Sequence, residues 1–103
     1  MFSLFKKKNT IIKYEKGTKG YWEEFIDPIL EEMQESKDDY EVKLTVYLEK
    51  IAKELSFLVG REVTVKEVRL VEDSACGHCD YFYKFTLYLQ WFVEREKAKN
   101  EKI

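Results

Sequence analysis

The first clear hydrophobic pattern of the chain lies between residues 20 and 35. Apolar residues recur there at i, i+3, i+4, i+7, i+8 and i+11, namely Trp22, Phe25, Ile26, Ile29, Leu30 and Met33. This spacing places them on one face of a helix. Pro28 falls inside the pattern. It predicts either a kink or the start of a second helix with Asp27 as its N-cap, because proline cannot donate a backbone hydrogen bond.

A second helical pattern follows a polar break at residues 36–39. Its apolar positions are Leu44, Tyr47, Leu48, Ile51, Leu55 and Leu58. Asp38 and Glu41 resemble a capping box, and Gly60 suits the residue that ends a helix. Residues 40–48 also alternate between apolar and polar, which would fit a strand that leads into a shorter helix from Glu49. We favour one long helix, because no turn residue separates the two halves.

The C-terminal half carries patterns typical of strands. Residues 62–71 are rich in β-branched side chains, with a change of face near Lys66 and Glu67 that suggests a bulge. Between residues 80 and 93 the odd positions form an unbroken apolar series of Tyr81, Tyr83, Phe85, Leu87, Leu89, Trp91 and Val93. The sequence therefore predicts an antiparallel β-hairpin of residues 62–72 and 80–93. The predicted fold is α+β, with two main helices packed on one face of a small antiparallel sheet.

Length and composition predict one domain over residues 1–103. Residues 1–9 are expected to form a flexible N-terminus and residues 94–103 a charged C-terminal tail. The chain is 45% hydrophobic and 37% charged. The charged share is above the usual value of about 25%, and the mixture of Lys and Glu resembles the surface of thermophilic proteins.

The charge distribution narrows the range of partners. The net charge is −2 and both signs are interspersed, which argues against a dedicated nucleic-acid binder. No apolar run reaches the roughly 18 residues that span a bilayer. The two cysteines lie three positions apart and cannot staple the fold, so we expect a reducing, cytoplasmic location.

The segment Cys76-Gly77-His78-Cys79 is the main candidate for chemistry. Two thiolates at this spacing can bind one metal ion, most simply zinc, with His78 as a candidate third ligand. They can also exchange a disulfide, or be small turn residues without chemistry. The same four residues form the motif of protein disulfide isomerases, but there the motif opens a helix after a buried strand. Here an aromatic segment follows it, and we prefer a metal site at the tip of the predicted hairpin.

A quarter of the chain, from Leu55 to Phe82, resembles the C-terminal part of the vinyl-reductase-type small-molecule-binding domain, often called hydrocarbon-binding. The resemblance rests on residues 58–63, on Glu67, on Cys76-Gly77 and on residues 79–82. It departs from that family where Leu70 stands in place of a cysteine. The resemblance implies an α+β domain that binds a ligand near its cysteines, without implying reductase activity.

The aromatic residues of the last segment exceed what two helices can cover. A surplus of this kind usually marks a partner or a ligand. We therefore expect a homodimer, with Phe82, Tyr88 and Phe92 at the interface. The chain is interpreted as a small binding module for a metal or a small apolar ligand. The alternative is a non-enzymatic interaction protein that uses its aromatic face for homodimerisation or partner docking. Enzymatic activity is left open but disfavoured, because the sequence offers no obvious nucleophile–base pair.

Overall fold

A computed structural model describes residues 14–77 and 79–101, and every regular element in these ranges is a helix. The helices are α2 (Lys19–Glu35), α3 (Tyr40–Val59), α4 (Val65–Ala75) and α5 (Tyr81–Glu101). The predicted α+β fold is therefore wrong, since the described residues contain no strand and no sheet. The predicted flexible terminus of residues 1–9 lies outside the described residues.

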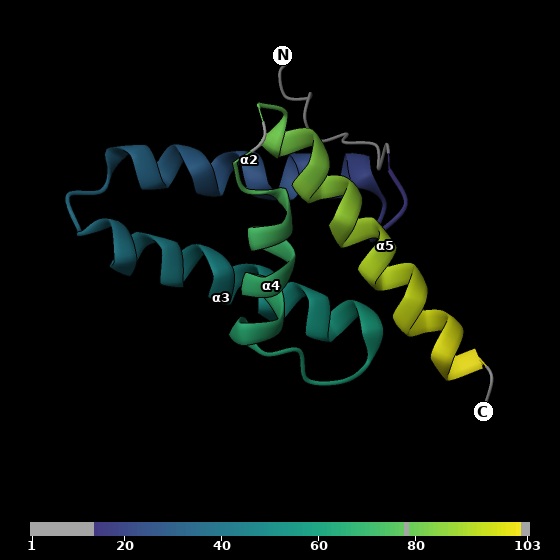
Figure 1. Ribbon diagram of the computed structural model, residues 1–103. Coiled ribbons are helices and arrows are strands. Elements are labelled where there is room, and N and C mark those ends of the chain that lie inside the picture. Colours follow the sequence, from purple (N-terminus) through teal and green to yellow (C-terminus); the bar gives the residue numbers. More distant parts are fainter. Residues whose placement is uncertain (1–13, 78, 102–103) are drawn as a thin grey trace, which may run out of the picture.

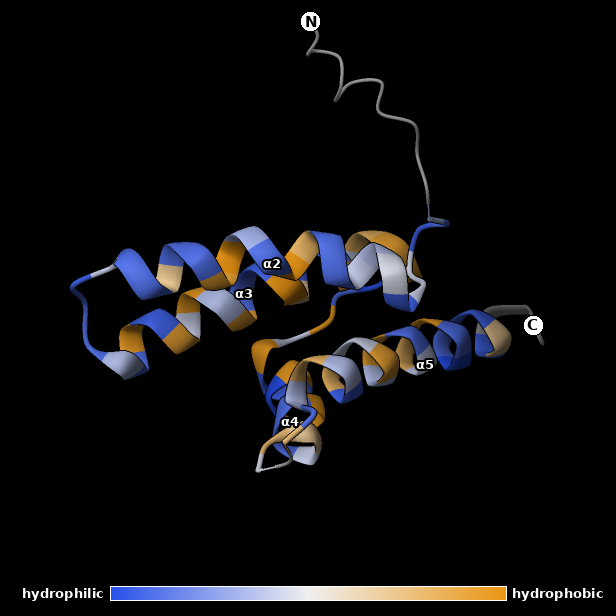
Figure 2. Ribbon diagram, turned by 90° about the horizontal axis from the view of Figure 1, so that it is seen from above, coloured by the Kyte–Doolittle hydropathy of each residue, from blue (hydrophilic) through white to orange (hydrophobic). Residues whose placement is uncertain are grey.

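The four helices form two pairs. Helices α2 and α3 run side by side and are joined by the short turn at residues 36–39 (Figure 1). Seen from above, α4 and α5 lie across one side of that pair (Figure 2). Helix α5 packs against all three other helices, and α4 also packs against α3. Helix α5 therefore covers the core that the other three helices form.

The prediction of two helices in the first half is confirmed. Pro28 lies inside the single helix α2, so no second helix begins there. Residues 40–48 belong to the one long helix α3, and the alternative strand is wrong. The N-cap residue is Asp39, without a side-chain cap, so the predicted capping box at Asp38 is also wrong. Gly60 ends α3 with a φ of 77°, a left-handed conformation that glycine adopts without strain.

Residues 65–75 are the helix α4, where the sequence predicted a strand. The reason is local: the Thr64 hydroxyl accepts a hydrogen bond from the Glu67 N–H, and the Glu67 carboxylate accepts one from the Thr64 N–H. This reciprocal capping box satisfies two donors at the first turn of the helix. The Arg61 guanidinium also forms an ion pair with the Glu67 carboxylate, at 3.1 Å. These contacts outweigh the weak strand preference of the β-branched residues.

Residues 81–101 are the helix α5, which replaces the predicted second strand. Its residues at helical spacing turn inward as one stripe, formed by Phe85, Leu89, Phe92, Val93 and Glu96. The charged residues from Glu94 onward continue this helix as far as Glu101. The odd positions form an apolar series because nearly every residue between 81 and 93 is apolar. The alternation therefore does not indicate a strand.

The core collects large side chains from all four helices. Its fully buried members include Trp22 and Ile26 on α2, Tyr47, Leu48, Ile51 and Leu55 on α3, Val68 on α4, and Phe85 and Leu89 on α5. Trp22 also donates its indole N–H to the carbonyl of Gly17 at 3.1 Å. Burial of these side chains fixes the orientation of α5 and so determines which of its residues face solvent.

Candidate functional site

The cysteine segment joins α4 to α5. Cys76 is the C-terminal cap of α4, and its N–H donates to the carbonyl oxygens of Glu72 and Asp73. Gly77 follows with a φ of 86°. Cys79 lies just before α5, and both cysteines are free and exposed. The expected hairpin tip is therefore a turn between two helices. His78, the candidate third ligand, lies outside the described residues.

The surroundings of Cys76 oppose a reactive thiolate. Its thiol lies 3.7 Å from the carboxylate of Glu72, to which it donates. Partial burial raises the pKa of the Cys76 thiol, and the negative charges of Glu72 and Asp73 raise it further. Thiolate is the form that binds zinc or attacks a disulfide. The local electrostatics therefore disfavour the free thiolate of Cys76, and with it redox exchange at this residue.

The expectation of a metal-binding turn finds no support in residues 14–77 and 79–101. No group of three or more His, Cys, Asp or Glu side chains in these ranges could hold a metal ion. Within the described residues, which do not include His78, the metal-binding interpretation is therefore unsupported.

A buried polar cluster lies next to Cys76 and links three helices. The carboxylate of Glu72, on α4, is 5% exposed and accepts a hydrogen bond from the Tyr81 hydroxyl at 3.2 Å. The Tyr81 and Tyr47 hydroxyls are 3.0 Å apart. Burial raises the pKa of both phenols far above ordinary values, so both stay protonated. Because its members satisfy one another, the cluster fastens α3, α4 and α5 together.

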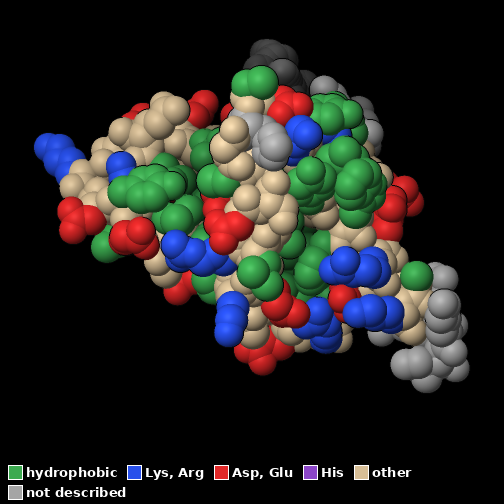
Figure 3. Space-filling model, in the orientation of Figure 1, with side chains coloured by type: hydrophobic (Ala, Val, Ile, Leu, Met, Phe, Trp, Pro, Cys, Tyr) green, Lys and Arg blue, Asp and Glu red, His purple; other side chains and the backbone are tan. Residues whose placement is uncertain are grey.

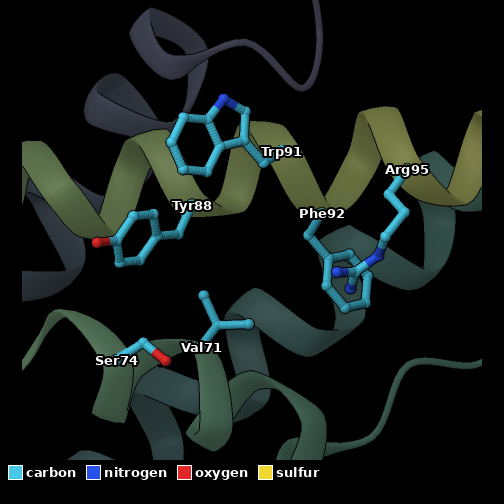
Figure 4. A pocket seen from close by; sticks show the side chains of 6 residues that line it. All are labelled: Val71, Ser74, Tyr88, Trp91, Phe92 and Arg95. Atoms are coloured by element: carbon cyan, nitrogen blue, oxygen red, sulfur yellow. The ribbon is translucent and has the colours of Figure 1, made fainter.

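A groove with an aromatic lining opens between α4 and α5. It has a volume of about 430 Å³ and is lined by Val71, Ser74, Tyr88, Trp91, Phe92 and Arg95. Figure 4 shows Val71 pointing from α4 toward α5, between the rings of Tyr88 and Phe92. The rings of Tyr88 and Trp91 lie 5.5 Å apart and form the outer wall. Trp91 remains 51% exposed, although it is among the most hydrophobic side chains of the protein.

Helical spacing extends this wall into a stripe along α5. Lys84, Tyr88, Trp91 and Arg95 follow at i, i+4, i+7 and i+11, so two aromatic residues lie between two cations. In the space-filling view, hydrophobic side chains gather over α5 and Lys and Arg side chains lie below them, toward its C-terminal end (Figure 3). The stripe is therefore apolar at its centre and positive at its ends.

Arg95 differs from the other charged residues near the groove. Its guanidinium lies over the Phe92 ring, 5.5 Å from the centroid, and no described carboxylate forms an ion pair with it. The nearby carboxylates are engaged elsewhere: Glu96 contacts Arg61 at 3.1 Å and Lys99 at 3.3 Å, and Glu94 accepts from Gln90 at 3.0 Å. The charge of Arg95 is therefore available to a ligand in the groove.

A second groove lies between α2 and α3, with a volume of about 600 Å³. It is lined by Phe25, Ile29, Lys50, Lys53, Glu54 and Phe57. Half of these residues are charged, and two of them are held within the fold. Lys50 pairs with Glu32, and Glu54 accepts a hydrogen bond from Tyr21. This groove is larger and also exposes apolar surface, but its lining lacks the contacting Tyr88 and Trp91 rings and the guanidinium of Arg95, which pairs with no described carboxylate. We therefore take the α4–α5 groove as the stronger candidate.

The three residues predicted at an interface have different environments. Tyr88 lines the α4–α5 groove, and Phe92 forms its floor while being only 6% exposed. Phe82 packs against the core. The sequence interpretation missed Val71, Ser74, Trp91 and Arg95. A signal for Val71 and Ser74 was present in the capping box of Thr64 and Glu67, which marks the start of α4.

No helix among the described residues is long and apolar enough to cross a membrane. The chain matches no protein-family model, no curated protein and no solved structure. The resemblance to the hydrocarbon-binding domain stays a prediction, although the strand expected from it at residues 62–71 is largely the helix α4 in this chain.

Proposed function

We propose that this protein is an interaction module that docks an apolar helical segment of a partner protein in the α4–α5 groove. The observation that carries the proposal is the wall of Tyr88 and Trp91, which remains open to solvent beside Val71. Tryptophan and tyrosine are the residue types that most often dominate binding energy at protein interfaces. A groove between two helices is a common receptor for an amphipathic helix.

The charge pattern favours a partner over a second copy of the same chain. In a two-fold pairing of α5 stripes, residue numbers that add to the same sum face each other, so Tyr88 would meet Trp91 of the other copy. Lys84 would then meet Arg95 at both ends of the contact. Like charges placed opposite each other weaken an interface. The homodimer expected from the sequence is therefore the less favoured occupant of this groove.

The proposal can be tested with a labelled amphipathic peptide of about 16 residues, long enough to form a helix, that carries two leucines one turn apart. Binding should shift Trp91 emission to shorter wavelength, while the buried Trp22 stays constant as an internal reference. Val71→Asp should weaken binding about tenfold or more, since a carboxylate would enter an apolar groove. Val42→Asp, at an exposed valine of α3, should leave binding unchanged.

Three results would contradict the proposal. One is the absence of any saturable shift in Trp91 emission. Another is light scattering above the monomer mass of 12.4 kDa, with Val71→Asp restoring the monomer, because the occupant would then be a second copy. The third is a shift with anionic vesicles and none with the peptide, which would assign the surface to lipid.

A further inference from the structure

We infer that the segment docked in the α4–α5 groove is acidic, and that Arg95 binds a carboxylate placed next to its apolar anchor. This inference rests on the proposed function, because it specifies the chemistry of the occupant. It concerns specificity, whereas the aromatic wall concerns affinity.

The position of Arg95 supports the inference. Its guanidinium lies over the Phe92 ring at the edge of the groove, as Figure 4 shows. The ring holds the cation by a cation–π interaction and leaves its N–H groups free to donate. A carboxylate can accept two parallel hydrogen bonds from one guanidinium, which gives both energy and orientation.

The charged side chains near Arg95 are engaged within the fold, so Arg95 is the cation available to bind a carboxylate. Arg61 also lies near Phe92, at 5.9 Å from the ring centroid, but it already contacts Glu67 and Glu96. Glu94, next in sequence to Arg95, lies on the side of α5 that faces α2. There it accepts from Gln90, whose own side-chain oxygen accepts from the N–H of Lys19. An acidic ligand would therefore meet a cation without a competing carboxylate.

The opposite end of the stripe carries Lys84. A helical segment with an acidic residue on each side of its apolar anchors would match both cationic ends in either orientation. A basic segment would place like charges together at both ends, which raises the cost of docking. The stripe thus selects for acidic and against basic partners.

The test compares three versions of the same leucine peptide, with Glu, Gln or Lys on both sides of the leucine pair. Fluorescence anisotropy of the labelled peptides measures affinity at about 0.15 M salt, where distant charges are screened. Wild-type protein should bind the Glu version about fivefold more tightly than the Gln version, and the Lys version least tightly. Arg95→Gln should reduce the preference for Glu to about twofold or less.

Two variants make the test specific. Lys97→Gln removes the same charge from the opposite side of α5 and should keep the full preference for Glu. Arg95→Glu leaves one cation, Lys84, and one anion at the two ends of the stripe, and should abolish the preference for the Glu version over the Lys version. Equal affinity of wild-type protein for the Glu and Gln versions would overturn the inference and leave the proposed function standing. Equal effects of Arg95→Gln and Lys97→Gln would also overturn it, because only net charge would then matter. If none of the three peptides binds, the proposed function itself fails.

Discussion

Helices α3 and α5 have nearly the same length, 20 and 21 residues, yet they use their apolar residues differently. The middle of α3 turns its apolar side chains into the core, where Leu48, Ile51 and Leu55 are fully buried. Helix α5 buries one apolar stripe and exposes a second, in which Tyr88 and Trp91 touch each other beside the groove. Apolar residues on the inner stripes stabilise the fold, whereas the outer stripe of α5 leaves apolar surface for a ligand.

The exposed apolar residues of α3 sharpen the contrast. Tyr40, Val42, Val46 and Phe57 are also open to solvent, and they are spread along the helix. Phe57 is approached by the ammonium group of Lys16, 5.5 Å from the ring centroid. Single exposed apolar residues are common on soluble proteins and need no partner. Phe57 also lines a groove, but Tyr88 and Trp91 differ from it because their two rings contact each other along one wall.

The largest expected effects come from the inner stripes of both helices. Leu48→Ala in α3 and Leu89→Ala in α5 should each lower the free energy of unfolding by about 2–5 kcal/mol, because each removes a fully buried side chain and leaves a cavity. Urea unfolding monitored by circular dichroism measures both. A loss below about 1 kcal/mol for Leu89→Ala would show that α5 is not fastened to the core as described.

A smaller loss of stability is expected from breaking the ion pair between Arg61, just after the end of α3, and Glu96 of α5. Arg61→Gln removes the ion pair to Glu96, whose side chain is 8% exposed, and should cost about 1–2 kcal/mol at pH 7. Arg61 lowers the pKa of the Glu96 carboxyl and of the Glu67 carboxyl below their ordinary value of 4.5. A carboxyl whose pKa is lower in the folded state stabilises the protein above the unfolded pKa, and this stabilisation is lost as the pH falls through the folded pKa.

The difference in stability between wild-type protein and Arg61→Gln should therefore be largest at neutral pH and should shrink below about pH 4.5. Lys37→Gln, an exposed lysine between α2 and α3, serves as the control and should show no such dependence. A pH-independent difference for Arg61→Gln would contradict the ion-pair explanation.

The capping box gives the next effect, because it decides whether α4 forms the second wall of the groove. Thr64→Ala removes the oxygen that accepts from Glu67 N–H and should cost about 1 kcal/mol. Thr64→Ser keeps that oxygen and should remain within about 0.5 kcal/mol of wild type. Equal losses in the two variants, measured by thermal unfolding, would show that the cap does not stabilise α4.

The sequence predicts α2 and α3 well, because charged residues occupy the positions between their apolar residues. The apolar spacing then fits the helical period best. The same reasoning fails for α5, where only Lys84, Thr86 and Gln90 break an apolar run, so that strand and helix periods fit equally. It fails for α4 because the β-branched residues suggested a strand, while the capping box at Thr64 determined a helix. The groove could not be predicted, since it requires α4 and α5 to be helices that pack side by side. Tyr88 and Phe92 were nevertheless selected, because the surplus of aromatic residues is visible in either conformation.

The most direct test of the account compares two residues that lie two positions apart on α5. Trp91→Ala should lower the free energy of unfolding by about 1–1.5 kcal/mol, clearly less than Leu89→Ala, since Trp91 is half exposed and packs on Tyr88, and should weaken binding of the labelled leucine peptide more than about tenfold. Leu89→Ala should do the reverse: a large loss of stability with peptide affinity nearly unchanged under conditions where the variant stays folded. Urea unfolding and peptide anisotropy on the same samples give both quantities. If Trp91→Ala destabilises the fold as much as Leu89→Ala and leaves peptide binding intact, the outer stripe of α5 belongs to the core and the account is wrong.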